Sequence, residues 1–337
     1  MMLAVCLFFA VSGCNLKNSL PLSVENVQCH KVRVAPGPED FVFDAWHAVP
    51  RLLVSSHDRR QPEISGGIFW FDLETEKSGE MQRIGEPEKI LAFKPHGMDI
   101  IRKNGRTLLY VILHDPYARM ERSENAVIVY AVDGNRLWFE RFLEDDVCLW
   151  SPNDLSVLPS GDIYATNDYR GDMALYFRSA SSEIAFYDPA GDAWKIVARD
   201  MAFANGILAE EEQVYVTVMF DEELLMFPRE SDGSLGEPET VVRVKGGDNI
   251  MKYRNWLLIT AHYDDLAFLG HMKDPEKLSP SVVFVVRPEI HSKHAVFVND
   301  GKMISAASTA MAYQEKIYIS QVFEPYIVVC DLPAFMK

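Results

Sequence analysis

Six short polar pairs recur along the chain, each just before an apolar strand. They are Glu39-Asp40, His96-Gly97, Asn153-Asp154, Asn205-Gly206, Asp248-Asn249 and Ser308-Thr309. Carboxylate and amide oxygens are the hard donors that Ca²⁺ prefers, whereas zinc and copper sites usually include cysteine or histidine. A buried group of such oxygens is costly to leave without partners, so several pairs in register predict a divalent cation site, although a single pair would more simply shape a turn. The predicted oxygen donors are Glu39, Asp40, Asn153, Asp154, Asn205, Asp248 and Asn249.

Two histidines accompany these donors. His96 is itself a member of a polar pair, and His114 ends the strand that follows in the same repeat, within the residues YVILHD. Each histidine alone is more often structural. Two imidazoles beside a cation would form a proton-handling pair, because an imidazole titrates near working pH.

The spacing of the pairs also predicts the fold. Each pair leads into an apolar strand, a polar turn and a second β-rich strand, as in residues 151–168, which read SPNDLSVLPSGDIYATND. The first members are separated by 57, 57, 52, 43 and 60 residues. Strand repeats of this period are typical of propeller blades, so we expect an all-β, six-bladed β-propeller. Equivalent positions of radially repeated blades face one axis, and the six pairs should therefore converge at one end of a central channel.

Two insertions interrupt the strand pattern. Residues 169–181 follow the central repeat, and their Met173, Ala174, Tyr176 and Phe177 could form the apolar face of a short helix. Such an insertion would overhang the channel as a helical lid or remain a plain surface loop. The second insertion, residues 264–280, is more polar.

Length and charge narrow the possible functions. The chain has 337 residues and no linker-like stretch, and a closed β-architecture of this size often forms one domain. The formal net charge of −16 would repel a phosphate backbone, which disfavours nucleic acid as a partner. The acidic surplus is ordinary for a solvated surface and is also compatible with carboxylates gathered around cations.

The N-terminus predicts export. Residues 1–13 form an apolar run of signal-peptide length, and the Val11 to Cys14 tetrad resembles a bacterial lipobox whose cysteine is lipidated. No Lys or Arg precedes the run, so plain secretion and an intracellular location stay open. We expect residues 1–14 to be a leader, 15–28 a linker and 29–337 a single propeller, in an exported protein that is lipid-anchored through Cys14, periplasmic or secreted.

Three cysteines lie beyond the leader. Cys29 and Cys330 sit at the two ends of the repeat array, where a disulfide would close the ring in an oxidising compartment. Cys148 is better explained as a lone buried thiol than as a nucleophile.

Several motifs together resemble the paraoxonase/arylesterase family, whose members are calcium-dependent six-bladed lactonases and esterases. The similarity runs from about Cys29 to Leu332. The matching segments are PED at 38–40, PHGM at 95–98, NDLSVLPSGDIYATND at 153–168, FANGI at 203–207, DNI at 248–250 and CDL at 330–332. The likeness to gluconolactonase-like propellers is weaker, because those use a different, single-metal ligand set.

The resemblance implies two calcium ions. Glu39, Asn153, Asn205, Asp248 and Asn249 match the ligands of the catalytic ion. Asp40, Asp154 and the backbone carbonyl of Met98 match those of a structural ion. His96 and His114 match the family's histidine pair, Asp168 matches an acidic residue near the active site, and Cys29 and Cys330 match the ring-closing disulfide.

Two departures concern the substrate. Tyr169 follows Asp168 where the animal enzymes tend to have His, and residues 57–60 read HDRR, more charged than the apolar wall of a lipophilic pocket. We therefore expect a calcium-dependent hydrolase of lactones, with aryl esters as a second class, in which the cation polarises the carbonyl and the histidine pair helps to activate water. The alternative is a non-catalytic, calcium-stabilised propeller that binds a ligand or partner at its channel mouth. Strictosidine-synthase-like condensation is disfavoured by the full set of oxygen ligands.

Overall fold

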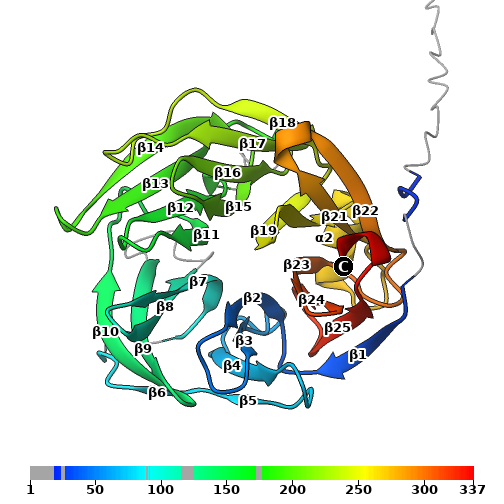
Figure 1. Ribbon diagram of the computed structural model, residues 1–337, viewed down its shortest axis with the longest axis horizontal. Helices are drawn as coiled ribbons and strands as arrows, with labels where there is room; N and C mark the ends of the chain where they lie inside the picture. Colours follow the sequence, from blue (N-terminus) through cyan, green and yellow to red (C-terminus); the bar gives the residue numbers. More distant parts are fainter. Residues whose placement is uncertain (1–18, 24–26, 89, 91, 115–124, 172–176) are drawn as a thin grey trace, which may run out of the picture.

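The computed structural model describes residues 19–23, 27–88, 90, 92–114, 125–171 and 177–337. Six antiparallel sheets stand around a central axis as the blades of a propeller (Figure 1), which confirms the predicted fold class. In each sheet the strand that comes first in the blade lies nearest the axis and the later strands follow outward.

Each blade contributes four strands in this order, and one blade carries a fifth. The inner strands are β2 (Pro38–Asp44), β7 (Pro95–Lys103), β11 (Pro152–Val157), β15 (Ala204–Ala209), β19 (Gly247–Tyr253) and β23 (Ala307–Tyr313). The second strands are β3 (Arg51–Ser56), β8 (Arg106–Leu113), β12 (Ile163–Asn167), β16 (Gln213–Val218), β20 (Trp256–His262) and β24 (Lys316–Gln321). The third strands are β4 (Gly67–Asp72), β9 (Ala126–Asp133), β13 (Ser182–Asp188), β17 (Glu223–Pro228), β21 (Ser281–Arg287) and β25 (Tyr326–Asp331).

The outer strands complete the blades. They are β5 (Ser78–Glu80), β10 (Arg136–Leu143), β14 (Ala193–Met201), β18 (Glu239–Arg243), β22 (Ser292–Asn299) and β1 (Cys29–Arg33). Strand β6 (Gln82–Ile84) adds to the second blade by pairing in parallel with β10. The described helices are α2 (Asp265–Lys273) and the 3₁₀ turns η1 (Pro288–Ile290) and η2 (Ala334–Met336).

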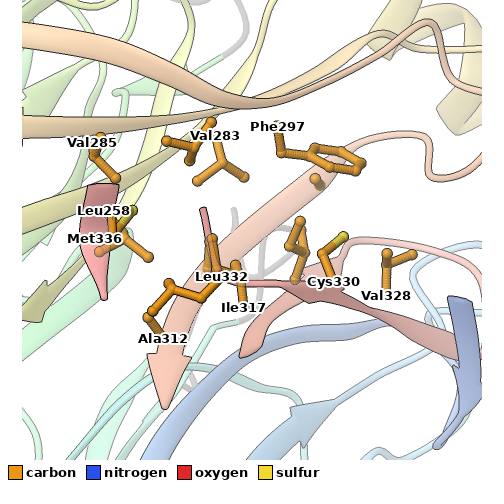
Figure 2. Close-up of a cluster of buried hydrophobic side chains, with 14 of the residues drawn as sticks. Leu258, Val283, Val285, Phe297, Ala312, Ile317, Val328, Cys330, Leu332 and Met336 are labelled. Carbon is orange, nitrogen blue, oxygen red and sulfur yellow. The ribbon is translucent and has the colours of Figure 1, made fainter. Parts of the chain in front are cut away.

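The core lies between neighbouring blades. Strands such as β21, SVVFVVR, are apolar on both faces because each face of the sheet packs against a neighbouring blade. Figure 2 shows one such layer, in which Val283, Val285 and Phe297 of the fifth blade meet Ile317 and Val328 of the sixth. Burying one such aliphatic side chain is worth about 1.5–3 kcal/mol, so the six interblade layers hold the ring and keep its inner strands in fixed register.

The ring is closed by the chain's first described strand. Strand β1 becomes the outer strand of the last blade, where Cys29 lies opposite Cys330 in the β1–β25 register. These cysteines form a disulfide with an S–S distance of 2.05 Å, which confirms the predicted pairing and agrees with export. Cys148 is the free, buried thiol that was predicted, and burial raises its pKa to about 11.

The helical lid predicted for residues 169–181 stays a prediction, because residues 172–176 lie outside the described residues. The second insertion, residues 264–280, contains α2. The leader and the Cys14 tether also lie outside the described residues. No helix in the described ranges has the length and apolar character needed to cross a bilayer.

Candidate active site at the end of the central channel

All six inner strands are irregular at the polar pair. Each shows a register shift against the second strand of its blade, the mark of a β-bulge, which re-aims the side chains around it. The shifts fall between Pro38 and Asp40, Pro95 and Met98, Pro152 and Leu155, Ala204 and Ile207, Gly247 and Ile250, and Ala307 and Ala310. The repeat phase read from the sequence is therefore one structural position, at the start of each inner strand.

Glycine occupies the second place of two pairs because the neighbouring strand comes very close. A Cβ atom at Gly97 would lie 2.6 Å from Asp154 Cα, and one at Gly206 would lie 2.5 Å from the Asp248 carbonyl oxygen. Both contacts are shorter than any side chain tolerates. These glycines thus allow the inner strands to crowd around the axis, which brings the polar side chains of adjacent blades together.

Four oxygen atoms of these pairs are buried and accept no hydrogen bond. They are Glu39 Oε2, Asn153 Oδ1, Asn205 Oδ1 and Asn249 Oδ1. Buried acceptors without a donor are costly, and most buried polar groups in proteins are hydrogen-bonded. Several buried oxygens that accept no hydrogen bond are suited to binding a hard cation.

Hydroxyl groups of the sixth blade hold two of these side chains in place. Ser308 Oγ donates to Glu39 Oε1 over 3.0 Å, which leaves Oε2 as the carboxylate oxygen that accepts no hydrogen bond. Asn249 Nδ2 donates to Thr309 Oγ1 over 2.8 Å, which turns Asn249 Oδ1 the other way. The Ser308-Thr309 pair therefore orients acceptors contributed by its neighbours.

Asp248 completes the predicted set through a different contact. Its Oδ2 lies 2.9 Å from Nε2 of His262, and both side chains are buried. Histidine and carboxylate pairs of this kind commonly orient a metal-ligating group. The sequence prediction did not include His262.

Asp40 and Asp154 lie between inner strands. Asp40 Oδ2 accepts the Met98 N–H over 2.8 Å, and Asp154 Oδ2 accepts the Ile207 N–H over 2.9 Å, so each carboxylate links its strand to the next blade. Burial raises the pKa of Asp40 well above its ordinary value, and Glu39 adds repulsion. The pKa of Asp154 is also raised well above its ordinary value, by burial and then by Asp40.

This donor set fits calcium. Among the described residues, no three His, Cys, Asp or Glu side chains converge as a metal site, so a cation here must depend on asparagine amides as well. Amide and carboxylate oxygens together are typical calcium ligands. A positive charge at this end of the channel would stabilise both the oxygens that accept no hydrogen bond and the carboxylates that repel one another. The structure thus places the residues that were predicted to bind calcium at the bulged starts of the inner strands.

The six polar pairs form a first ring of side chains, and a second ring lies just beyond it. In every blade, the residue that ends or follows the second strand donates its backbone N–H to the carbonyl two residues before the polar pair. The bonds join His57 to Gly37, His114 to Lys94, Asp168 to Ser151, Met219 to Phe203, His262 to Gly246 and Val322 to Ala306. His114, predicted from its strand position, and Asp168, predicted from the resemblance, therefore occupy equivalent positions. His57 and His262 share that position and were missed.

The His96 and His114 rings lie together, with centroids 5.0 Å apart. Nδ1 of His114 is 2.7 Å from the Pro152 carbonyl oxygen, and since a carbonyl can only accept, Nδ1 carries a proton. Nδ1 of His96 is buried without a hydrogen bond, 3.4 Å from Glu39 Oε2. Burial holds the pKa of His96 well below its ordinary value, and Arg59 and His114 add to this effect.

Asp168 is fixed by short hydrogen bonds. Its Oδ1 accepts from Ser151 Oγ and from the Tyr169 N–H, each over 2.6 Å. Burial raises the pKa of Asp168, and the neighbouring His114 opposes that rise. Asp168 therefore belongs to the same electrostatic group as the histidines.

Arg59 is the other residue that the prediction did not place in the site. It lies in the loop after β3, and its Nη2 is 3.3 Å from Glu39 Oε2. The sequence showed only that residues 57–60 are unusually charged, because a loop residue has no strand phase from which its direction can be read. Two surface hollows of about 270 and 290 Å³ lie elsewhere, beside residues 21–23 and 27–29 at the outer edge of the fifth blade.

Comparisons with known proteins agree with this picture. A family model described as Arylesterase matches residues 57–332. Human serum paraoxonase/lactonase 3 is 25% identical over 287 residues, covering 80% of this chain and 78% of that protein. Human serum paraoxonase/arylesterase 2 is 23% identical over 336 residues, covering 92% and 90%.

Solved structures show the same fold. A gluconolactonase from Xanthomonas campestris has a TM-score of 0.60 at 16% identity, with 92% of this chain and 91% of that chain covered. A luciferin-regenerating enzyme gives a TM-score of 0.58 at 10% identity, with 92% and 96% covered. The resemblance inferred from the motifs is confirmed, since the family match spans most of the propeller, and this chain belongs to the arylesterase family.

Proposed function

We propose that this chain is a calcium-dependent hydrolase of lactones, with aryl esters as a second class of substrate. Membership of the arylesterase family supports a lactone or ester hydrolase in general. The observation that carries the finer proposal is the group of four buried oxygens at the channel end that accept no hydrogen bond, on Glu39, Asn153, Asn205 and Asn249.

The residues that would hold the catalytic ion are those four and Asp248. Asp40, Asp154 and the Met98 carbonyl would hold a second, structural ion. A calcium ion bound at the first site supplies Lewis acidity that polarises the substrate carbonyl and stabilises the negative charge that develops on its oxygen.

The chain's own residues handle the proton. His96 offers an unpartnered Nδ1 beside Glu39, at which a proton of the attacking water is held. His114, fixed through Nδ1 by the Pro152 carbonyl, orients its neighbour or passes the proton on, and Asp168 lies close enough to balance the charge. The water oxygen bonds to the carbonyl carbon, the ring C–O bond breaks, and the proton is returned to the departing alkoxide, which gives a hydroxy acid.

The test is a panel of γ- and δ-lactones of differing chain length, together with phenyl acetate, assayed with calcium, after chelation and after calcium is restored. We expect hydrolysis that is lost on chelation and recovered with calcium. Asn205→Ala should abolish the activity, whereas Asn255→Ala, in an exposed turn of the fifth blade, should not change it. If the parent protein hydrolyses none of these compounds, the non-catalytic binding propeller replaces this proposal.

A further inference from the structure

Two neighbouring arginines after β3 are used differently. The guanidinium of Arg60 is engaged by its neighbours: it donates to Glu324 over 2.9 Å and to the carbonyl of His271 over 2.8 Å, and it lies over the Phe323 ring. Within the described part of the chain, Arg59 donates one hydrogen bond, to the His57 carbonyl at 3.3 Å, besides its ion pair with Glu39. A guanidinium has five N–H donors, so Arg59 retains donors that no described group fills.

The loop that carries Arg59 is held firmly. Asp58 closes it by accepting the Arg60 N–H at 3.0 Å and the Gln61 amide at 2.7 Å, and Arg60 ties it to α2. The Arg59 side chain keeps 18% of its surface exposed although it reaches the buried Glu39. Arg59 is therefore a fixed, solvent-accessible cation at the end of the channel.

The surroundings of Arg59 differ from the rest of the molecule. The chain as a whole has a net charge of −16, yet the cations Arg59, which follows β3, and Lys94, which precedes β7, both lie near His57 on the side of the first two blades. Across the axis, at the ends of β15 and β16 (Figure 1), Phe203 stacks on Tyr169 at 5.3 Å and meets Phe220 at 5.1 Å. The side of the first two blades therefore suits an anionic group of a bound molecule, and the aromatic side across the axis suits an apolar part.

We propose that the substrate carries a carboxylate, which Arg59 binds while the ester bond lies at the cation site. This inference rests on the proposed function and adds the substrate class to it. Arginine suits the role because its planar fork binds a carboxylate through two parallel hydrogen bonds. The competing explanation is that Arg59 only neutralises Glu39 and its acidic neighbours, in which case it would not distinguish charged from neutral substrates.

A matched pair of lactones separates these explanations. γ-Butyrolactone-γ-carboxylate and the corresponding γ-carboxamide have the same shape and differ in charge. The parent protein should prefer the carboxylate in kcat/KM by roughly 10- to 100-fold, the usual effect of one charge-assisted pair. Arg59→Gln should bring the ratio of the two kcat/KM values close to one, whatever its effect on the absolute rates, and Arg59→Lys should restore part of that ratio.

Arg141→Gln is the control for general electrostatics. Arg141 lies on β10, the outer strand of the second blade, where it is exposed and pairs with Asp192, so its loss removes the same charge away from the channel end. This variant should keep the full preference. A preference lost equally in Arg141→Gln would overturn the assignment to Arg59.

A binding measurement tests the inference without hydrolysis. Glutarate, titrated by calorimetry at saturating calcium, should bind the parent and Arg141→Gln proteins and should bind Arg59→Gln at least 10-fold more weakly. Equal binding to Arg59→Gln, or an equal fall in rate on both lactones in that variant, contradicts the inference while the proposed function stands. Failure of the parent to hydrolyse these lactones and every compound of the panel above would instead refute the proposed function, and glutarate binding would then decide whether Arg59 recognises carboxylates.

Discussion

Replacing Asp154 by Asn should have opposite effects on stability in the absence and in the presence of calcium. The Asp154 carboxylate is 5% exposed and accepts backbone N–H groups from Leu155 at 2.8 Å and from Ile207 at 2.9 Å. No described cationic side chain forms an ion pair with it, and the Asp40 carboxylate lies close enough to raise its pKa further. An unpaired buried charge costs several kcal/mol, so the parent protein should depend on a cation here.

The expected magnitudes follow from these contacts. Asn keeps one acceptor oxygen but loses one charge-assisted bond, worth about 1.5–3 kcal/mol, and it removes a charge whose burial costs at least as much. After chelation, Asp154→Asn should therefore be as stable as the parent or more stable. With calcium at 100 times the dissociation constant the parent should gain about 2.7 kcal/mol, or about 5 °C in Tm, and the variant much less.

Asp99→Asn is the matched control. Asp99 is likewise a carboxylate on an inner strand that accepts the N–H of a neighbouring blade, here from Val157 at 2.7 Å. Burial raises its pKa to about 6, but no second carboxylate contributes to that shift. Thermal melts with and without chelator should show the parent's full calcium shift in Asp99→Asn. A parent whose Tm ignores calcium, or a variant Asp154→Asn that gains as much as the parent, would refute the reasoning.

Three other predictions concern the ring and the histidines. Replacing Cys29 and Cys330 together by Ala opens a loop with a sequence separation of 301 and should lower the free energy of unfolding by up to about 6 kcal/mol, measured in urea; an unchanged midpoint contradicts this. Burial, Arg59 and Lys94 lower the pKa of His57 from 6.5 to about 4, so as the pH falls from 6.5 to 4 the unfolded chain binds a proton that the folded chain does not, and about 3 kcal/mol of stability should be lost. His57→Asn should flatten that part of the plot of urea midpoint against pH, and an unaltered plot would count against this prediction. His96→Gln should lower kcat by about 10² to 10⁴ with calcium content unchanged, and His114→Gln by less; a near-parent rate in His96→Gln makes a carboxylate the leading base.

The cation site could be predicted because its position repeats with a recognisable residue type. Asn153, Asn205 and Asp248 each stand at the same distance before an apolar strand, and polar residues there are conspicuous. The physical reason appeared only in the structure, where every inner strand is bulged at that point. Sequence periodicity thus located the site without revealing the bulge that aims it.

His57 and His262 escaped prediction because the members of the second ring share a backbone hydrogen bond and not a chemistry. His57, His262 and Met219 each donate an N–H to the carbonyl before the inner strand, and nothing in their side chains marks them as equivalent. The ends of the strands before His114 and His262, YVILHD and ITAHYD, held a weak signal of this phase. Arg59 had no such signal, because the direction of a loop side chain depends on contacts made by α2 and the sixth blade, far away in sequence.

The six equivalent positions of the first ring do different work, and this asymmetry explains how unpartnered acceptors persist in a packed ring. Gly97 and Gly206 supply space, since neither tolerates a Cβ atom. Ser308 donates to one carboxylate oxygen of Glu39, and Thr309 accepts from the amide nitrogen of Asn249, so the other oxygen of Glu39 and the amide oxygen of Asn249 are left for a cation. If all six pairs carried only carboxylates and amides, no hydroxyl would fix their orientation, and a bound cation would have to order every side chain at once. Because two pairs carry glycine in their second place and one pair carries hydroxyls, Glu39 and Asn249 are oriented before any cation binds, which lowers the ordering cost of binding.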